Sequence, residues 1–180
     1  MRKAMVTVLL TAVSLIWMSS ALADESADDS TYYTRVGFAY HKGVHKTTNY
    51  LQGTRVPINT EVELLKKKGE SISIRVVGTG EKVKIVNIRN FSGEGLDGIF
   101  ERMFSREETD LSAYSPEQVK QITAGVFNPG MTKEEIVLSI GYPPKHKTPS
   151  LDQNQWRYWQ NRWDTVLLYF KDGVMDSMLD

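Results

Sequence analysis

The stretch that decides the fold is residues 128–144, which read Asn-Pro-Gly-Met-Thr-Lys-Glu-Glu-Ile-Val-Leu-Ser-Ile-Gly-Tyr-Pro-Pro. Thr132 and Glu135 have the spacing of a capping box, in which the two side chains satisfy backbone N–H groups at the start of a helix. Apolar residues at helical spacing follow, and Gly141 with two prolines ends the pattern. The stretch therefore predicts a helix that begins after Thr132 and ends at Gly141.

The segments on either side predict a small domain with both helices and strands. Before the stretch, residues 115–118 (Ser-Pro-Glu-Gln) form a second capping box with proline at the first helical position, and Gly125 supplies a stop. After it, three runs read as antiparallel strands, at residues 156–160, 165–170 and 174–179. Asp172-Gly173 is a type I′ hairpin signal between the last two. The order is two helices followed by a three-stranded meander.

This order resembles the small domain of BamE (also called SmpA or OmlA), a component of the bacterial outer-membrane assembly machinery. The resemblance includes a Gly-x-Pro element at residues 141–143 and a Trp-rich strand, and it covers about residues 113–179. It implies a two-layer ααβββ domain that binds other proteins of the cell envelope. Domains of this kind are also similar to the repeats of a secreted β-lactamase inhibitory protein.

The first half of the chain is predicted to be a β-rich, barrel-like domain at residues 31–92. Residues 71–76 and 82–88 alternate apolar and polar side chains, which places one face in a core and the other in water. Residues 50–62 resemble the entry of a bacterial barrel of the SH3 type. The predicted fold class is therefore α+β, with a small all-β SH3-like barrel followed by a BamE-like ααβββ two-layer domain at residues 113–180.

A connector at residues 93–112 separates the two predicted domains. Its apolar side chains recur at the spacing of an amphipathic helix, at Leu96, Ile99, Phe100, Met103 and Phe104. A polar run follows them. We expect the apolar stripe to dock on one of the two domains.

Residues 1–23 have the features of a signal peptide, with two basic residues, a short apolar core and small residues before Asp24. The apolar core is too short to span a membrane as a helix. Residues 24–30 are acidic and are expected to form a disordered leader. These features predict a periplasmic protein, exported by a cleavable signal peptide and without an integral membrane segment. BamE is normally a lipoprotein, which requires a cysteine at the mature start, so lipidation is not expected here.

The composition argues against several kinds of chemistry. There is no cysteine, which removes disulfides and thiolate sites. Without the signal peptide, 20 basic residues face 22 acidic ones, so net charge indicates no nucleic-acid partner. The three histidines (His41, His45 and His146) are expected to be exposed loop residues, and the first two lie next to Lys42 and Lys46. They lack a carboxylate in metal-ligand spacing, and no nucleophile motif is present. We therefore expect no metal, no cofactor and no enzymatic activity.

The strand Trp156-Arg157-Tyr158-Trp159 is the most unusual local composition. Trp156 and Tyr158 share one face, and Arg157 and Trp159 share the other. One face must pack on the helices, while the other is either covered by the first domain or exposed to a partner. Under the second interpretation, the partner-binding residues are Trp159, Trp163, Arg157, Tyr142 and Tyr169. The proline-rich loop at residues 142–149 would orient them rigidly.

The predicted function is protein–protein contact or scaffolding in the periplasm, in support of outer-membrane assembly, with an unidentified envelope protein as partner. A first alternative is a peptidoglycan- or glycan-binding module, for which Tyr32, Tyr33, Tyr40 and Tyr50 would supply exposed aromatic rings. A second alternative is a proteinaceous inhibitor of an envelope enzyme. Both alternatives are binding functions without catalysis.

Overall fold

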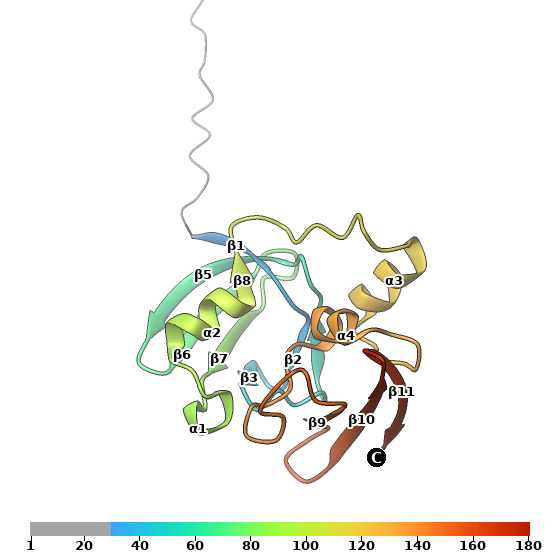
Figure 1. The fold of residues 1–180 in the computed structure, drawn as a ribbon. Coiled ribbons are helices and arrows are strands. Elements are labelled where there is room, and N and C mark those ends of the chain that lie inside the picture. The colour runs from blue at the N-terminus through green and yellow to red at the C-terminus, as the bar shows by residue number, and fades with distance from the viewer. Residues whose placement is uncertain (1–29) are drawn as a thin grey trace, which may run out of the picture.

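The computed structural model describes residues 30–180 and shows a mixed α+β protein in which a curled sheet lies beside a smaller sheet with helices (Figure 1). The predicted signal peptide and residues 24–29 of the predicted leader lie outside the described residues. Within residues 30–180, no helix is long and apolar enough to cross a membrane.

The curled sheet has six strands in the order β3-β7-β6-β5-β1-β8. Their bounds are β1 Thr31–Thr34, β3 Val44–Lys46, β5 Glu61–Lys68, β6 Ser71–Val76, β7 Lys82–Val86 and β8 Phe104–Ser105. All neighbours are antiparallel except β3 and β7, which are parallel. A separate pair, β2 (Phe38–Tyr40) and β4 (Thr54–Val56), completes this half. The alternation predicted for β6 is confirmed, because Ile72, Ile74 and Val76 are buried.

The predicted connector contributes to the first hydrophobic core. Its helix α2 (Leu96–Met103) buries Ile99 and Met103 against the curled sheet, and Leu96 and Phe100 pack at the margin. The docking expected of this stripe is therefore confirmed. A single turn, α1 (Arg89–Ser92), precedes α2, and β8 follows it and pairs with β1.

The second half has the predicted order of two helices and a meander. Its helices are α3 (Pro116–Ala124) and α4 (Lys133–Ile140), and its strands are β9 (Gln155–Trp159), β10 (Thr165–Lys171) and β11 (Val174–Leu179). Both predicted capping boxes are formed. Asp172 and Gly173 have φ values of 53° and 82°, as a type I′ turn requires. The strand order is β11-β10-β9.

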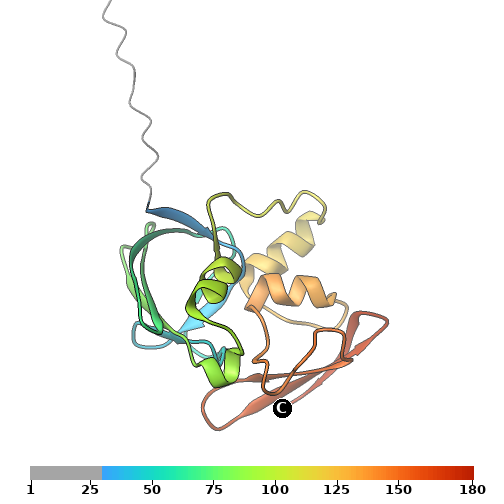
Figure 2. The same ribbon diagram turned by 60° about the vertical axis from the view of Figure 1, so that its left-hand side comes forward.

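Figure 2 shows α4 lying over one face of this sheet, and the second core is formed by side chains from α4 and from that face. Trp156 and Tyr158 are fully buried there, whereas α3 packs beside α4 and is not part of the core cluster. Two residues from the first half of the chain, Val36 and Leu51, insert into this core. The two halves therefore interlock instead of meeting at a flat interface.

Backbone contacts hold the interlocked halves together. Gly37 N–H donates to Leu138 O (2.8 Å), and Leu51 N–H donates to Trp159 O (2.9 Å). The Asn49 side chain is buried and its Nδ2 donates to Ile140 O and to Tyr142 O, both at 2.9 Å. The bonds to Leu138 O and Ile140 O satisfy carbonyls in the last turn of α4, where a helix leaves acceptors unpaired.

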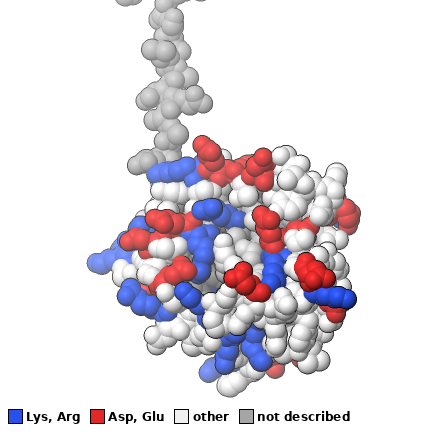
Figure 3. Space-filling view, in the orientation of Figure 1, with Lys and Arg blue, Asp and Glu red and all other residues white. Residues whose placement is uncertain are grey.

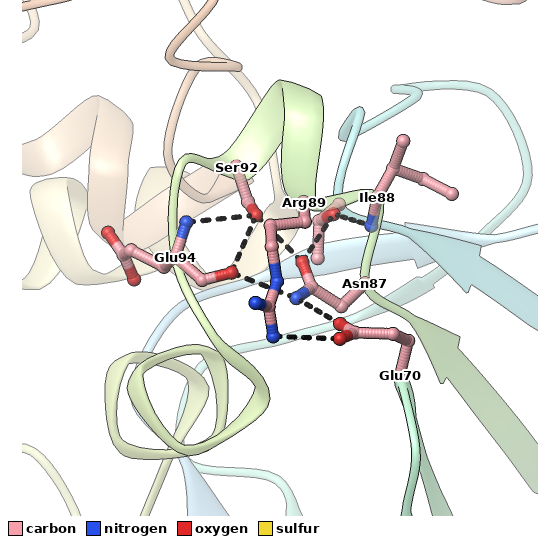
Figure 4. A network of polar contacts seen from close by, with 7 residues as sticks. Glu70, Asn87, Ile88, Arg89, Ser92 and Glu94 are labelled. Atoms are coloured by element: carbon pink, nitrogen blue, oxygen red, sulfur yellow. Dashed lines mark hydrogen bonds and ion pairs between the residues drawn. The ribbon is translucent and has the colours of Figure 1, made fainter.

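A buried polar network closes the far end of the curled sheet (Figure 4). Asn87, which follows β7, donates through Nδ2 to Glu70 Oε2 (2.8 Å) and to Glu94 O (3.0 Å). Its Oδ1 accepts from Ser92 Oγ (2.7 Å) and from Thr47 Oγ1 (3.3 Å). The amide of Asn87 is thus fully satisfied, and it fixes α1 against the segment that leads from β3 into the second core.

Candidate functional site

The five predicted partner-binding residues lie in three separate places. Tyr142 and Trp159 are half-buried where the two halves meet. Arg157 and Tyr169 lie on the outer face of the second sheet, opposite the core. Trp163 lies in the turn between β9 and β10 and is 75% exposed. The predicted single aromatic patch is therefore not assembled.

Trp159 is largely used by the fold, contrary to its predicted role in a partner-binding patch. Its ring lies parallel to the His146 ring (centroids 6.5 Å apart), and His146 in turn contacts Phe91 of α1 (4.2 Å). Its Nε1 is buried. Tyr142 is also packed within the fold, because the Arg102 guanidinium of the first half lies 4.8 Å from its ring centroid. The physical reason is the pairing of residues 50–52 with the end of β9, which brings the first half over this part of the sheet.

The first half of the chain does not cover the rest of the outer face of the second sheet. Leu167 pairs across the sheet with Arg157 on one side and with Leu179 on the other, so the three side chains form a row. Tyr169 lies one pleat further along β10. Neither hydrophobic core of the described residues includes any of these four side chains, and Leu179 is 59% exposed. The first half therefore does not convert this face into an interdomain core.

A groove of about 610 Å³ runs between this face and the proline-rich loop. Arg157, Leu167 and Tyr169 line it from the sheet, and Lys147 lines it from the loop. Thr148 Oγ1 accepts a hydrogen bond from Arg157 N–H (3.0 Å), which attaches the loop to the edge of β9. The predicted orienting role of the loop thus has a geometric basis at Arg157, through Thr148, and at Trp159, through His146.

The turn that carries Trp163 is rigidly held. Asn161 Oδ1 accepts from Trp163 N–H (2.8 Å) and from Asp164 N–H (3.1 Å), and Asn161 Nδ2 donates to Asp164 Oδ2 (2.8 Å). The Arg162 guanidinium lies 4.3 Å from the Trp163 ring centroid. This turn presents an arginine and an indole together at the surface.

Beside this turn lies a pocket of about 430 Å³ that sequence analysis did not anticipate. It is formed where β2, the turn into β3, residues 50–52 and the β9–β10 turn meet. Its lining residues are Ala39, His41, Lys42, Val44, Lys46, Tyr50, Gln52, Asn161 and Arg162. Lys42 and Lys46 already stood out as neighbours of the first two histidines, but nothing local linked them to Arg162.

Two of the four tyrosines of the glycan-binding alternative, Tyr32 and Tyr40, pack against other side chains of the first half. Tyr40 is buried in the first core, and its hydroxyl donates to Glu81. Tyr32 is half-buried, with Phe100 edge-on at 5.0 Å and the Arg106 guanidinium 3.9 Å from its ring centroid. The expected exposure of Tyr40 is wrong, because its place in β2 directs the ring inward.

Comparisons of the chain with protein-family models, with curated proteins and with solved structures find no match. Residues 30–180 contain no group of three or more His, Asp or Glu side chains arranged to hold a metal ion.

The expectation that the histidines are exposed loop residues is wrong for His45. His45 lies fully buried in β3, and its Nδ1–H donates to Ala39 O (2.7 Å). Burial disfavours the imidazolium and lowers the pKa of His45 from 6.5 to about 4. The folded protein therefore keeps this ring neutral under conditions in which the unfolded chain takes up a proton.

Acidification is expected to destabilise the protein through His45. Because the pKa is lowered in the folded state, the free energy of unfolding should fall by about 3 kcal/mol as pH drops from about 6.5 to below about 4. Urea unfolding at about pH 7 and about pH 4 measures the loss. His45→Asn is the matched control, since its amide can still donate to Ala39 O but does not titrate. Equal losses in the wild type and the variant would contradict the prediction.

Proposed function

We propose that this chain is a non-enzymatic periplasmic protein that binds another envelope protein through the outer face of β9, β10 and β11. In this proposal the first half is an SH3-like barrel, the second half is a BamE-like domain, and residues 1–23 are a cleavable signal peptide. The resemblance of residues 113–179 and the signal-peptide features support the location and the class of function.

The observation that carries the proposal is the apolar character of a sheet face that the protein's own cores do not use. An antiparallel sheet with one face on a core normally has polar residues on the other face. Here Leu167, Tyr169 and Leu179 occupy the outer face, with Arg157 in the same row as the two leucines. Tyrosine and arginine are enriched among the residues that dominate binding energy at protein interfaces.

The basic side chains of the groove indicate the charge of the partner segment. Arg157 donates through Nη1 to Thr165 Oγ1 (3.2 Å), and among the described residues neither Arg157 nor Lys147 is in an ion pair with a carboxylate. We therefore expect the partner segment to carry an acidic side chain beside apolar ones. A carboxylate from the partner would form a charge-assisted hydrogen bond with the guanidinium.

Site-specific photo-crosslinking in intact cells tests the proposal. A photo-reactive phenylalanine analogue replaces Tyr169 in one protein and Val77 in a matched control, because Val77 is an exposed apolar residue of the first half. We expect a discrete crosslinked product from position 169 and none from position 77. Adding Arg157→Glu should remove the product without changing the melting temperature.

Equal crosslinking from both positions, or a product that survives Arg157→Glu, would contradict the use of this face. The partner in the crosslinked product also separates the two protein-binding functions. A structural envelope protein supports scaffolding, whereas an enzyme with a blocked active site supports the inhibitor alternative.

A further inference from the structure

We propose that the pocket beside the β9–β10 turn binds a small organic anion, namely an apolar body that carries a carboxylate or phosphate monoester. This site is separate from the groove on the outer face of the second sheet, with which it shares no lining residue. The proposal therefore does not depend on the protein-binding function.

The size and floor of the pocket suit a small molecule. Its volume of about 430 Å³ falls in the range of small-molecule sites. Most of the surface that lines the pocket is apolar, and Ala39, Val44 and Tyr50 are among the residues that line it. Burial of an apolar body on this floor supplies binding energy in proportion to the area removed from water.

The charges around the floor specify an anion. Lys42, Lys46 and Arg162 line the pocket, and no Asp or Glu does. Among the described residues none of the three cations is in an ion pair, although four other basic residues are paired with carboxylates. The chain as a whole has 22 residues of each sign, and basic and acidic side chains both occur on the face drawn in Figure 3. An unpaired basic cluster over an apolar floor is therefore a local feature that favours an anionic head group.

The walls of the pocket are held in place before any ligand binds. One wall is a two-residue hairpin, in which His41 and Val44 exchange backbone hydrogen bonds of 3.0 and 3.1 Å. Lys42 and Gly43 have φ values of 50° and 73°, as a type I′ turn requires. The other walls are joined by Gln52 N–H, which donates to Gln160 O (3.0 Å). A preformed site loses little conformational entropy on binding.

The same backbone bonds favour a small molecule over an extended peptide. A peptide that binds by strand addition needs free N–H and C=O groups at a sheet edge. At this end of β9 the edge is already paired with residues 50–52, through Leu51 N–H to Trp159 O and Gln52 N–H to Gln160 O. A ligand in this pocket is therefore recognised by side chains and not by backbone groups. Apolar side chains form the floor of the pocket, and basic side chains surround it.

Calorimetric titration of the purified protein tests the proposal with octanoate and octyl phosphate as probes. Acetate supplies the head group alone, and octanol supplies the apolar body alone. We expect either anionic amphiphile to bind at least tenfold more tightly than acetate or octanol, and more weakly as salt is added. The stronger of the two anions identifies the head group.

Variants localise the binding. Lys42→Gln with Lys46→Gln should weaken the anionic probe about tenfold and leave octanol unchanged, since two partly exposed ion pairs are lost. The matched control is Lys66→Gln with Lys68→Gln, two exposed lysines of β5 that do not line the pocket and should not matter. Val44→Phe fills the floor and should weaken the anionic probe and octanol alike.

Three results would overturn the proposal. The first is an anionic amphiphile that binds no more tightly than acetate, and the second is equal weakening by the two lysine pairs. The third is failure of both amphiphiles together with tight binding of an acidic, apolar peptide, which would make the pocket a peptide site. Melting temperatures establish that each variant is folded, and the lysine variants test the site even if Val44→Phe does not fold.

Discussion

Replacing Trp156 by alanine is expected to lower the free energy of unfolding by about 3–5 kcal/mol. The Trp156 side chain is fully buried between α4 and the second sheet, with its ring centroid 4.7 Å from that of Phe170. Alanine would remove the transfer energy of an indole and leave a cavity that α4 and the sheet cannot close without separating from other contacts. Urea unfolding, followed by circular dichroism, measures the change.

Trp163→Ala is the matched control for this prediction. It makes the same chemical change, but Trp163 is 75% exposed and contacts Arg162 of its own turn. We expect a change within about 0.5 kcal/mol, as for most surface substitutions. Equal costs for the two variants, or a larger cost for Trp163→Ala, would mean that the indole of Trp156 is not the packing element of the second core.

Replacing Gly37 by alanine is expected to lower the free energy of unfolding by more than about 3 kcal/mol. Gly37 N–H donates to Leu138 O at 2.8 Å, and a methyl group on Gly37 would collide with the backbone oxygen of Ser139. The backbone of α4 cannot yield without moving away from the sheet beneath it. The neighbouring Val36, which inserts into the second core, would be displaced as well. The midpoint of urea unfolding measures the effect.

Gly78→Ala provides the comparison, because a methyl group at Gly78 would meet no atom within 4 Å. Alanine there should be neutral or stabilising by less than about 1 kcal/mol, since it restricts the unfolded chain. If Gly37→Ala were as stable as Gly78→Ala, the close approach of Gly37, which precedes β2, to α4 could not be what joins the two halves.

Local patterns correctly predicted the helices α2, α3 and α4 and the strands β6, β7, β9, β10 and β11. The boxes at Ser115 and Thr132, the alternation of β6 and the Asp172-Gly173 turn all formed as expected. Each pattern acts within a few residues, through a hydrogen bond or through the side on which a side chain points. The parallel pairing of β3 with β7 was not predicted, because no local pattern specifies the partner of a strand.

The candidate sites were predicted less well for the same reason. Alternation correctly assigned Arg157 and Trp159 to one face of β9, opposite Trp156 and Tyr158. It could not show that His146 and residues 50–52 would cover Trp159 while Arg157 remained in a groove. The net charge is nearly balanced, so it did not indicate a basic site. Lys42, Lys46 and Arg162, which are in no ion pair among the described residues, line one pocket only in the folded chain.

The sequence by itself determined where α3 and α4 begin and end, which faces of β6 and β9 are apolar, and where the chain turns at Asp172-Gly173. Only the tertiary structure decided which apolar face stays uncovered and which basic residues share a pocket. The physical reason is that these outcomes depend on contacts between distant segments, such as the bond from Asn49 to Ile140, which are 91 residues apart. Such contacts form because they bury apolar area and satisfy helix-end carbonyls jointly, and no single segment contains both partners.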